Sequence, residues 1–537
     1  MSSYTTAGLV IPIILVICFA CFGRKGHFYN ISDYDLVRLQ PAVGFQGQWL
    51  VWPRAIAGSI FQSKRWSMEG YIKYSKAGKP FIIPSIERGI AVIIPLQQLR
   101  SIYSLPENVL NVQAAQDQTL QVRWTIWNQK ITDFRFHINV IRHQLTRNLD
   151  QLTPLIAAEI ERGIWDSCFK LVAGASNRAF CGIPICRDIR FLERLRDHAM
   201  AIFLGGVIIN ATPKFIRPAA GVAIGLVCHI LFRRASKICL PFVKARLEQT
   251  AMLRSDPEYC WVPPRDGLQW IIEESYASGD IGQLAPEIIC KRLLLVNDIS
   301  LHTTSFTVHN VILDLLSADP SKAYIESLRE ECEQVLTEAG GSWTVEAVNK
   351  LKLVDSTIRE SIRLTPIASV GLPRTVVHPN GTQLENYGVR IPYGTTIATP
   401  IEAIHYDEDI YANARRFDPF RFAQPGAAGN VFDNLSEGAT ADKELKPRNK
   451  PLLSASLDEA FLGFGFGKHA CPGRFFALNE MKIFIAHMII NYDLQPLSKK
   501  RPELIDFLWL KLPFHGGKVR VRRRAAKLLS ASELNLQ

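Results

Sequence analysis

A single cysteine lies in a short glycine-rich loop near the C-terminus of the chain. The stretch FGFGKHACPGRFFA, residues 464–477, places Cys471 among three glycines and one proline. Glycines let a backbone approach a flat ligand closely, and Pro472 stiffens the turn. A helical pattern begins at Arg474, so the dipole and free amides of the helix N-terminus would face the sulfur and favour its anion. The loop predicts a site built around a thiolate.

Four kinds of site could use such a cysteine. Zinc needs three or four protein ligands, and the loop supplies one. The spacing Gly465-x-Gly467-x-x-Ala470 imitates a dinucleotide fingerprint, but no βαβ pattern surrounds it. His469 is poorly placed to act as a base for a catalytic cysteine, and a structural cysteine would not explain the glycines. A lone thiolate suits haem iron, because the porphyrin supplies the other four equatorial donors.

The loop resembles the haem-binding signature of the cytochrome P450 superfamily. The residues that comply with that signature are Phe464, Gly467, His469, Cys471 and Gly473. The resemblance implies that Cys471 is the axial ligand of the iron. It also implies that His469, at a position where the superfamily has Arg or His, donates to a haem propionate.

Two further stretches resemble the segments that support this loop in the superfamily. Glu360-Ser361-Ile362-Arg363 matches the Glu-x-x-Arg motif, and Arg421 lies in a segment FDPFRF that supplies a second arginine to the same carboxylate. The resemblance implies a buried network of these three charged residues. We interpret it as structural support and not as chemistry, since loss of one partner from such a network costs several kcal/mol.

A third stretch, residues 298–305, resembles the superfamily's distal motif Ala/Gly-Gly-x-Asp/Glu-Thr. Thr303 keeps the alcohol, but Ser300 replaces the glycine and His302 replaces the acid. The resemblance implies that Thr303, with His302, passes protons to bound dioxygen. The alternative is that Thr303 bonds back to a carbonyl one turn earlier and that His302 is a core residue.

Haem propionates need cationic partners besides His469. The resemblance offers Arg374, in the strand region after the Glu-x-x-Arg motif, and Arg142 in an early helix. The superfamily commonly has Trp four residues before that helix arginine, whereas this chain has Ile138.

The resemblance covers nearly all of the chain from Gly78 to Phe514 and implies a mainly α fold with a small β lobe (α+β). Periodicity predicts helices at 96–104, 137–149, 152–173 and 286–316. Short apolar runs predict strands at 78–95 and 369–400, and residues 424–456 read as an exposed loop.

The first residues predict a single membrane anchor. Residues 7–23 carry no charge and span about 25 Å as a helix, and Arg24 and Lys25 follow at once. This pattern places the remainder in the cytoplasm, on the endoplasmic reticulum membrane. A cleaved signal peptide is the rival, but it would have a basic start and a small-residue cleavage site. We expect an anchor at 1–25, a linker and the start of the catalytic domain at 26–77, and the haem-thiolate domain at 78–537.

A second apolar stretch, residues 219–232, is too short to span and predicts a buried or surface-docked helix, which could also rest on the membrane face. The net charge of the 537-residue chain is +12, but no interleaved basic and aromatic stripe indicates nucleic-acid binding. The eleven cysteines show no paired framework, as expected of a reducing compartment.

The resemblance implies insertion of one oxygen atom from O₂ into a C–H bond, with electrons from NADPH through a membrane-bound flavoprotein reductase. The HTTS and CPGRFFA sequences are similar to fungal enzymes that oxidise terpenoids and related secondary metabolites, so we expect an apolar, terpenoid-like substrate. Its contacts by analogy are residues 103–121, 203–223, 297–304 and 366–372. The alternatives are a haem-thiolate isomerase or dehydratase that needs no reductase, and a non-catalytic haem-containing lipid binder.

Overall fold

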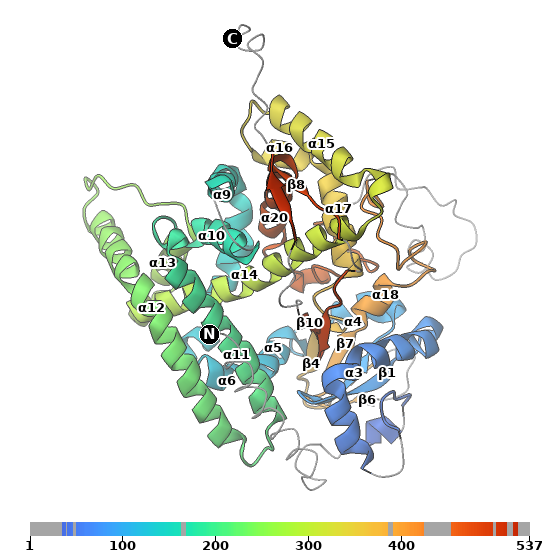
Figure 1. Ribbon diagram of the computed structural model, residues 1–537. Coiled ribbons are helices and arrows are strands. Elements are labelled where there is room, and N and C mark those ends of the chain that lie inside the picture. Colours follow the sequence, from blue (N-terminus) through green and yellow to red (C-terminus); the bar gives the residue numbers. More distant parts are fainter. Residues whose placement is uncertain are drawn as a thin grey trace, which may run out of the picture.

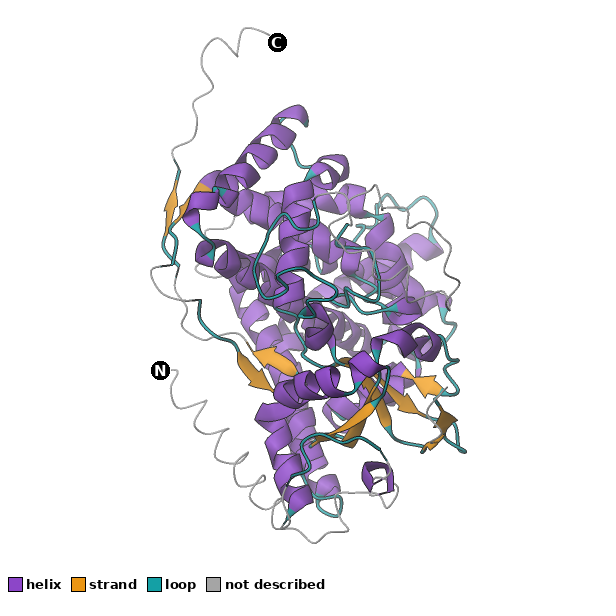
Figure 2. Ribbon diagram, turned by 90° about the vertical axis from the view of Figure 1, so that its right-hand side faces the viewer, coloured by secondary structure: helices purple, strands orange, loops and turns teal. Residues whose placement is uncertain are grey.

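The computed structural model describes residues 35–38, 40–46, 50–162, 168–384, 390–423, 453–497, 501–512 and 519–524. The predicted anchor at 7–23 and the basic pair Arg24 and Lys25 lie outside the described residues, as does most of the predicted loop at 424–456. Helices fill most of the molecule; most of the strands lie in its lower half, and one pair lies apart at the upper left (Figure 2). The predicted class, mainly α with a small β lobe, is confirmed.

α14 (Pro286–Ser317) runs through the middle of the molecule (Figure 1). Ten other described helices have at least nine residues. They are α3 (Val51–Lys73), α5 (Val112–Leu120), α9 (Leu149–Arg162), α10 (Cys168–Phe180), α11 (Ile189–Ala211), α12 (Arg217–Ser255), α13 (Gly267–Ala277), α15 (Tyr324–Glu338), α17 (Lys352–Leu364) and α20 (Arg474–Asn491). Of these, α10, α11, α12, α13, α17 and α20 contact α14. Short helices are α4 (Leu99–Tyr103), α6 (Val122–Thr125), α7 (Gln129–Asp133), α8 (Phe136–Val140), α16 (Val345–Lys350) and α18 (Ile401–His405). The main apolar core lies where α9, α10, α14, α17 and α20 meet.

The largest sheet has five strands in the order β1-β2-β7-β4-β3. They are β1 (Phe81–Ser85), β2 (Gly89–Ile93), β3 (Leu110–Asn111), β4 (Gly371–Val376) and β7 (Thr396–Thr399). β1 pairs antiparallel with β2, from Phe81 opposite Ile93 to Ser85 opposite Gly89, and β2 runs parallel to β7. Three two-stranded sheets comprise β5 (Thr382–Gln383) with β6 (Arg390–Ile391), β8 (Tyr492–Leu494) with β11 (Val521–Arg523), and β9 (Ile505–Phe507) with β10 (Leu510–Leu512). Both predicted strand regions are confirmed.

The predicted helices agree with the structure to different degrees. The segments at 96–104 and 286–316 are helical as predicted. The expected helix at 152–173 was wrong as a single element, because the structure has α9 ending at Arg162 and α10 beginning at Cys168. The expected helix at 137–149 contains η3, a π-helical turn at Ile141–Leu145, which follows α8 directly. Such turns interrupt α-helices most often at functional sites.

The second apolar stretch is part of a much longer helix than the sequence suggested. α12 has 39 residues and lies beside α11 on one flank of α14 (Figure 1). Among the described residues, it is the helix that is long and apolar enough to cross a membrane, with a mean hydropathy of 1.3 over an 18-residue window. A third of that window is buried, and Cys228 and Phe232 pack inward. α12 is therefore a packed helix of the domain with an apolar outer side.

Candidate functional site

The cysteine loop is closed by its own backbone. The amide of Cys471 donates to the carbonyl of Phe464 at 2.7 Å, and η7, a 3₁₀ turn, covers Gly467–His469. Gly465 and Gly467 have φ values of 84° and 65°, in the left-handed region that glycine adopts without strain. A Cβ added to Gly467 would meet no described atom within 4 Å. The loop thus presents a bare backbone face toward open space.

The Cys471 side chain is half-buried, and the helix that follows begins at Arg474 as predicted. Burial raises the pKa of this thiol, while the Gly473 amide and the Arg474 cation lower it. The predicted support from the helix N-terminus is present, but desolvation outweighs it. A bound cationic metal would deprotonate the sulfur outright.

The basic side chains of His469, Arg374 and Arg142 gather beside the loop. Burial lowers the pKa of His469, and the charges of Arg374, Lys468 and Arg142 lower it further while Glu107 raises it. In the described part of the chain, the Nε2 of His469 has no hydrogen-bond partner, although Glu107 Oε1 lies 3.3 Å away. The structure therefore brings together the three residues proposed from the sequence for the propionates.

Each of the two arginines is positioned by a different element. Arg374 is buried in β4, stacks on the Tyr103 ring at 5.0 Å and donates to the carbonyl of Pro373 at 2.9 Å. Arg142 comes from the π-helical turn η3, whose Ile141 lies against Gly473, 3.7 Å from the position of a Cβ there. The turn therefore lies directly beside the cysteine loop, and the departure at Ile138 does not displace Arg142 from it.

The predicted charged network is present and buried. Glu360 Oε2 lies 2.8 Å from Arg363 Nε and 3.1 Å from Arg421 Nε. The side chains of Glu360 and Arg363 are 0% exposed and that of Arg421 is 9% exposed. Arg363 also donates to the carbonyls of His405 and Ala414, at 2.6 and 2.7 Å. Almost all polar atoms of the network are satisfied, as burial of charge requires.

His405, which sequence reasoning missed, joins this network to the cysteine loop. Its Nδ1 donates to the carbonyl of Arg363 at 3.0 Å, and its Nε2 accepts the amide of Leu462 at 3.0 Å. Burial and the Arg363 charge lower the pKa of His405 to about 3, so the ring is neutral. A histidine at the end of the short helix α18 was the available signal, but no local motif connects it to residue 462.

α14 carries the segment 298–305 that resembles the distal motif, and two side chains of this segment are accessible to solvent. We call these two side chains, Ile299 and Thr303, the distal strip. Ile299 is 69% exposed and Thr303 is exposed one turn later, although both neighbouring stretches of the helix are buried. The Thr303 hydroxyl donates to the carbonyls of Ile299 and Ser300, at 3.2 and 3.3 Å. Thr303 thus makes the back-bond considered above and still faces open space.

His302 points to another side of α14. Its ring lies 5.9 Å from that of Phe169, and its Nε2 is buried without a hydrogen-bond partner among the described residues. Burial lowers the pKa of His302, whereas Asp298, one turn earlier on the same helix, raises it. Asp298 in turn is paired with His198 of α11. Sequence reasoning assigned no role to either of these two residues.

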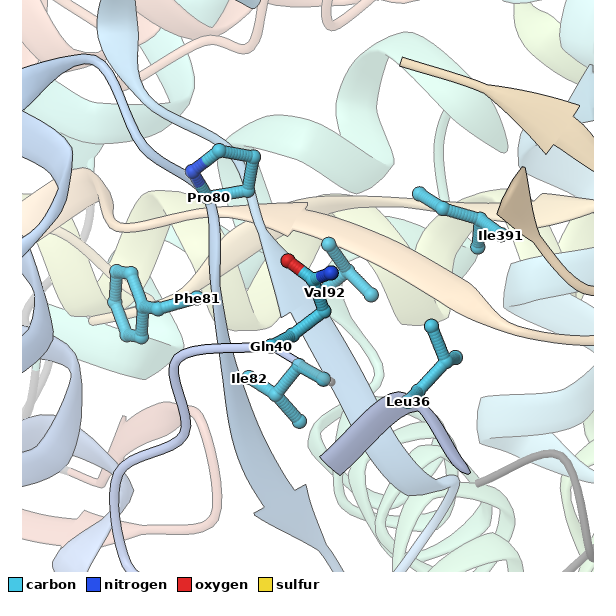
Figure 3. Close-up of a pocket in the computed structure, with 7 residues that line it drawn as sticks. All are labelled: Leu36, Gln40, Pro80, Phe81, Ile82, Val92 and Ile391. Carbon is cyan, nitrogen blue, oxygen red and sulfur yellow. The ribbon is translucent and has the colours of Figure 1, made fainter. Parts of the chain in front are cut away.

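A small apolar hollow elsewhere is not a reaction site. Seven residues line it at the start of the β lobe, among them Phe81, Val92 and Ile391 (Figure 3). None of the seven has a titratable side chain, and Gln40 is the polar one.

The residues of the loop fit a haem. A half-buried thiol, a bare glycine face, two arginines and a His469 Nε2 without a hydrogen-bond partner among the described residues are what an iron ligand and two carboxylates require. In the part of the chain that the structure describes, Glu107 is the carboxylate beside these groups, and it does not balance both arginines.

Comparisons with known proteins agree with this geometry. The family model for Cytochrome P450 matches residues 233–521. Cytochrome P450 monooxygenase okaG of Penicillium ochrochloron is 44% identical over 510 residues, which cover 91% of this chain and 94% of that protein. The chain is a cytochrome P450. This P450 is also similar to the monooxygenase gloP of Glarea lozoyensis, at 31% identity over 90% of this chain and 91% of the relative. A third relative is htyF of Aspergillus rugulosus, at 30% identity over 88% of this chain and 71% of the relative.

The family settles the general chemistry of this P450. It is an oxidoreductase, a monooxygenase similar to fungal members of the family, and it uses haem with a cysteine thiolate ligand. When bound, the haem iron activates O₂ for insertion of one oxygen atom into the substrate, and the thiolate favours O–O cleavage. The family generally takes its electrons from a redox partner and acts on small molecules. The residues that would hold the haem are Cys471, His469, Arg374 and Arg142.

Proposed function

We propose that this P450 is a membrane-anchored monooxygenase that oxidises an apolar, terpenoid-like secondary metabolite with electrons from NADPH, delivered by a flavoprotein reductase. The observation that carries the haem-thiolate part is the arrangement around Cys471, in which Arg142, Arg374 and His469 converge beside a half-buried thiol. Cys471 is the axial ligand in this proposal, and the three cations bind the propionates.

The distal strip supports the proposed substrate class. The accessible side chain at the centre of α14 is Ile299, an apolar group, and Thr303 adds a single hydroxyl. A site of this kind binds a substrate by removing apolar surface from water, with few polar groups to fix its orientation. Thr303 holds a proton at its Oγ1 on the side where oxygen would bind.

Exposed basic residues near the cysteine loop support the proposed reductase. Arg142, His143 and Arg147 are exposed in and just after η3, and Lys468 is exposed within the loop itself. A cationic rim at the face where electrons must enter would attract an acidic flavoprotein.

Apolar residues on α12 support contact with the membrane in addition to the proposed anchor. Val222, Leu226, Val227 and Ile230 are each between 43% and 51% exposed. Leu226 and Val227 are adjacent, and Val222 and Ile230 lie four and three residues to either side, which places all four within one side of the helix. Arg217 precedes them, and Arg233 and Arg234 follow, as in helices that lie at a lipid interface.

The spectrum of the reduced, carbon-monoxide-bound protein tests the haem-thiolate part. We expect a thiolate-type Soret band in the wild type and its loss in Cys471→Ser, with Cys332→Ser, at a buried cysteine outside the loop, as the control. A folded, haem-loaded wild type without that band would refute the assignment. Product analysis in a host that supplies a reductase and terpenoid scaffolds then tests the substrate class, and turnover without NADPH or reductase would contradict the electron source.

A further inference from the structure

A buried acid–imidazole pair joins α11 to the distal helix α14. His198 Nδ1 lies 2.9 Å from Asp298 Oδ2, and the two side chains are 0% and 8% exposed. α11 and α14 are neighbours in the fold, and α12 covers this junction with Phe232, whose ring lies 6.0 Å from that of His198 (Figure 1). The pair is thus enclosed by three helices.

Asp298 is placed to act on His302. Residues four apart on a helix share a face, so the Asp298 carboxylate lies one turn from the His302 ring and on the same side of α14. The charged groups that act on His302 are Asp298 from its own helix and Arg196 from α11. From α10 it meets the uncharged ring of Phe169. Burial lowers the pKa of His302, Asp298 raises it and Arg196 lowers it.

Three atoms of this cluster have unused hydrogen-bonding capacity. In the part of the chain that the structure describes, Asp298 Oδ1, His198 Nε2 and His302 Nε2 are buried without a hydrogen-bond partner. Leaving a buried polar group unsatisfied costs about 1–3 kcal/mol, so a cluster of three needs an explanation. Ordered water and exchangeable protons would satisfy all three atoms, beside the helix turn that carries Thr303.

We propose that Asp298, oriented by His198, takes the place of the distal acid that this chain lacks at position 302, and that it acts through His302. This inference rests on the function proposed above. One ring nitrogen of His302 takes a proton from solvent as the other releases a proton toward the Thr303 oxygen, and the Thr303 hydroxyl passes its own proton on toward the side where oxygen would bind. One N–H and one O–H bond form for each one that breaks, so both side chains are restored and one proton is delivered. The Asp298 carboxylate compensates the charge of the imidazolium, and Asp298 and His198 are positioning residues in this scheme.

The first test is a titration that does not depend on turnover. In the reduced, carbon-monoxide-bound protein with ¹⁵N-labelled histidine, we expect Asp298→Asn to lower the pKa of His302 by about one unit, because an adjacent opposite charge shifts a pKa by about 1–3 units. Asp298→Glu keeps the charge and should retain most of the wild-type value. An unchanged His302 titration in Asp298→Asn would overturn the proposal.

The second test measures coupling of electrons to product. Asp298→Asn should lower the product formed per NADPH about fivefold and raise hydrogen peroxide release, with the substrate-induced spectral shift unchanged. In a His302→Gln background the same substitution should have no further effect, since Asp298 acts through that ring. Equal losses in both backgrounds would show that Asp298 only ties α11 to α14.

His309→Gln provides the matched control. His309 lies on the same helix and also has a buried Nε2 without a partner among the described residues, but the charge acting on it is that of Arg501. In His309→Gln we expect the product formed per NADPH and the pKa of His302 to equal those of the wild type. A wild type without the thiolate-type Soret band would refute the proposed function itself, and the His302 titration would still report on its link to Asp298.

Discussion

His405 Nε2 accepts the backbone amide of Leu462 at 3.0 Å, two residues before the cysteine loop begins. Because the same ring donates to the carbonyl of Arg363 at 3.0 Å, one neutral imidazole connects the buried Glu360 network to the segment that carries the thiolate. The geometry of the loop therefore depends on the protonation state of a residue far from it in the sequence.

His405 should make the protein sensitive to acid. Its pKa is about 3 in the folded state and about 6.5 when unfolded, so the unfolded chain binds more protons between these values. The stability that His405 contributes is present above pH 6.5 and is lost as the pH falls toward 3. We expect His405→Gln to lower the free energy of unfolding at pH 7 by about 1–3 kcal/mol, and this difference from wild type to shrink toward pH 5. Urea unfolding at several pH values measures it, and a constant difference would contradict the assignment.

Loss of the buried Glu360 carboxylate should lower the free energy of unfolding far more than loss of an exposed carboxylate. Glu360→Gln leaves Arg363 and Arg421 buried without their counter-charge, at a cost of about 3–5 kcal/mol, and should reduce haem retention. Glu338→Gln is the control, because its 3.0 Å pair with Lys350 is exposed to solvent and should contribute little to stability. Thermal unfolding and haem content check both variants. Equal effects would show that the buried network is not the support of the loop.

Glu480 should limit stability at alkaline pH. This carboxyl is fully buried in α20, and its hydrogen-bond partner among the described residues is the Ser176 hydroxyl, 2.8 and 2.9 Å from its two oxygens. Burial raises its pKa to about 8, so the folded protein holds a proton that the unfolded chain loses near pH 4.5. The stability associated with the protonated acid is complete below pH 4.5 and is lost as the pH rises through 8. Glu480→Gln should therefore gain stability over wild type progressively from pH 5 to 8, by about 2–4 kcal/mol at the upper end. A gain independent of pH would contradict this.

Substitution of the exposed residue Arg147 should change the rate of electron delivery from the reductase and leave the other steps unchanged. Arg147→Glu should slow reduction by the reductase about three- to tenfold at low salt, with a smaller effect at high salt, because rim charges act mainly on association. Turnover supported by hydrogen peroxide should not change. Arg390→Glu, an exposed charge reversal in β6, is the control and should leave both rates unaltered. A loss of peroxide-supported turnover in Arg147→Glu would mean that the residue supports the haem site instead.

The parts of the site that could be predicted are those fixed by short spacing. Cys471 and its three glycines lie within the nine residues 465–473, and Glu360 and Arg363 lie one helical turn apart. Each set therefore forms a local pattern that can be recognised in the sequence. Arg421 was found only through the resemblance of its own segment. His405 and His198 were missed because their partners lie 57 and 100 positions away, and only the packing of distant helices brings them together. The break between α9 and α10 was missed because the apolar period continues on both sides of it.

Arg142, Arg374 and His469 are held close together, and Glu107 is the carboxylate beside them in the described part of the chain. The charges of the two arginines are not balanced there, so the chain is least stable before an anion reaches them. A ligand that binds only the folded chain stabilises it in proportion to the logarithm of its concentration. The amount of intact enzyme in a cell should therefore rise and fall with tetrapyrrole synthesis, since newly made chains that find no porphyrin remain exposed to proteolysis.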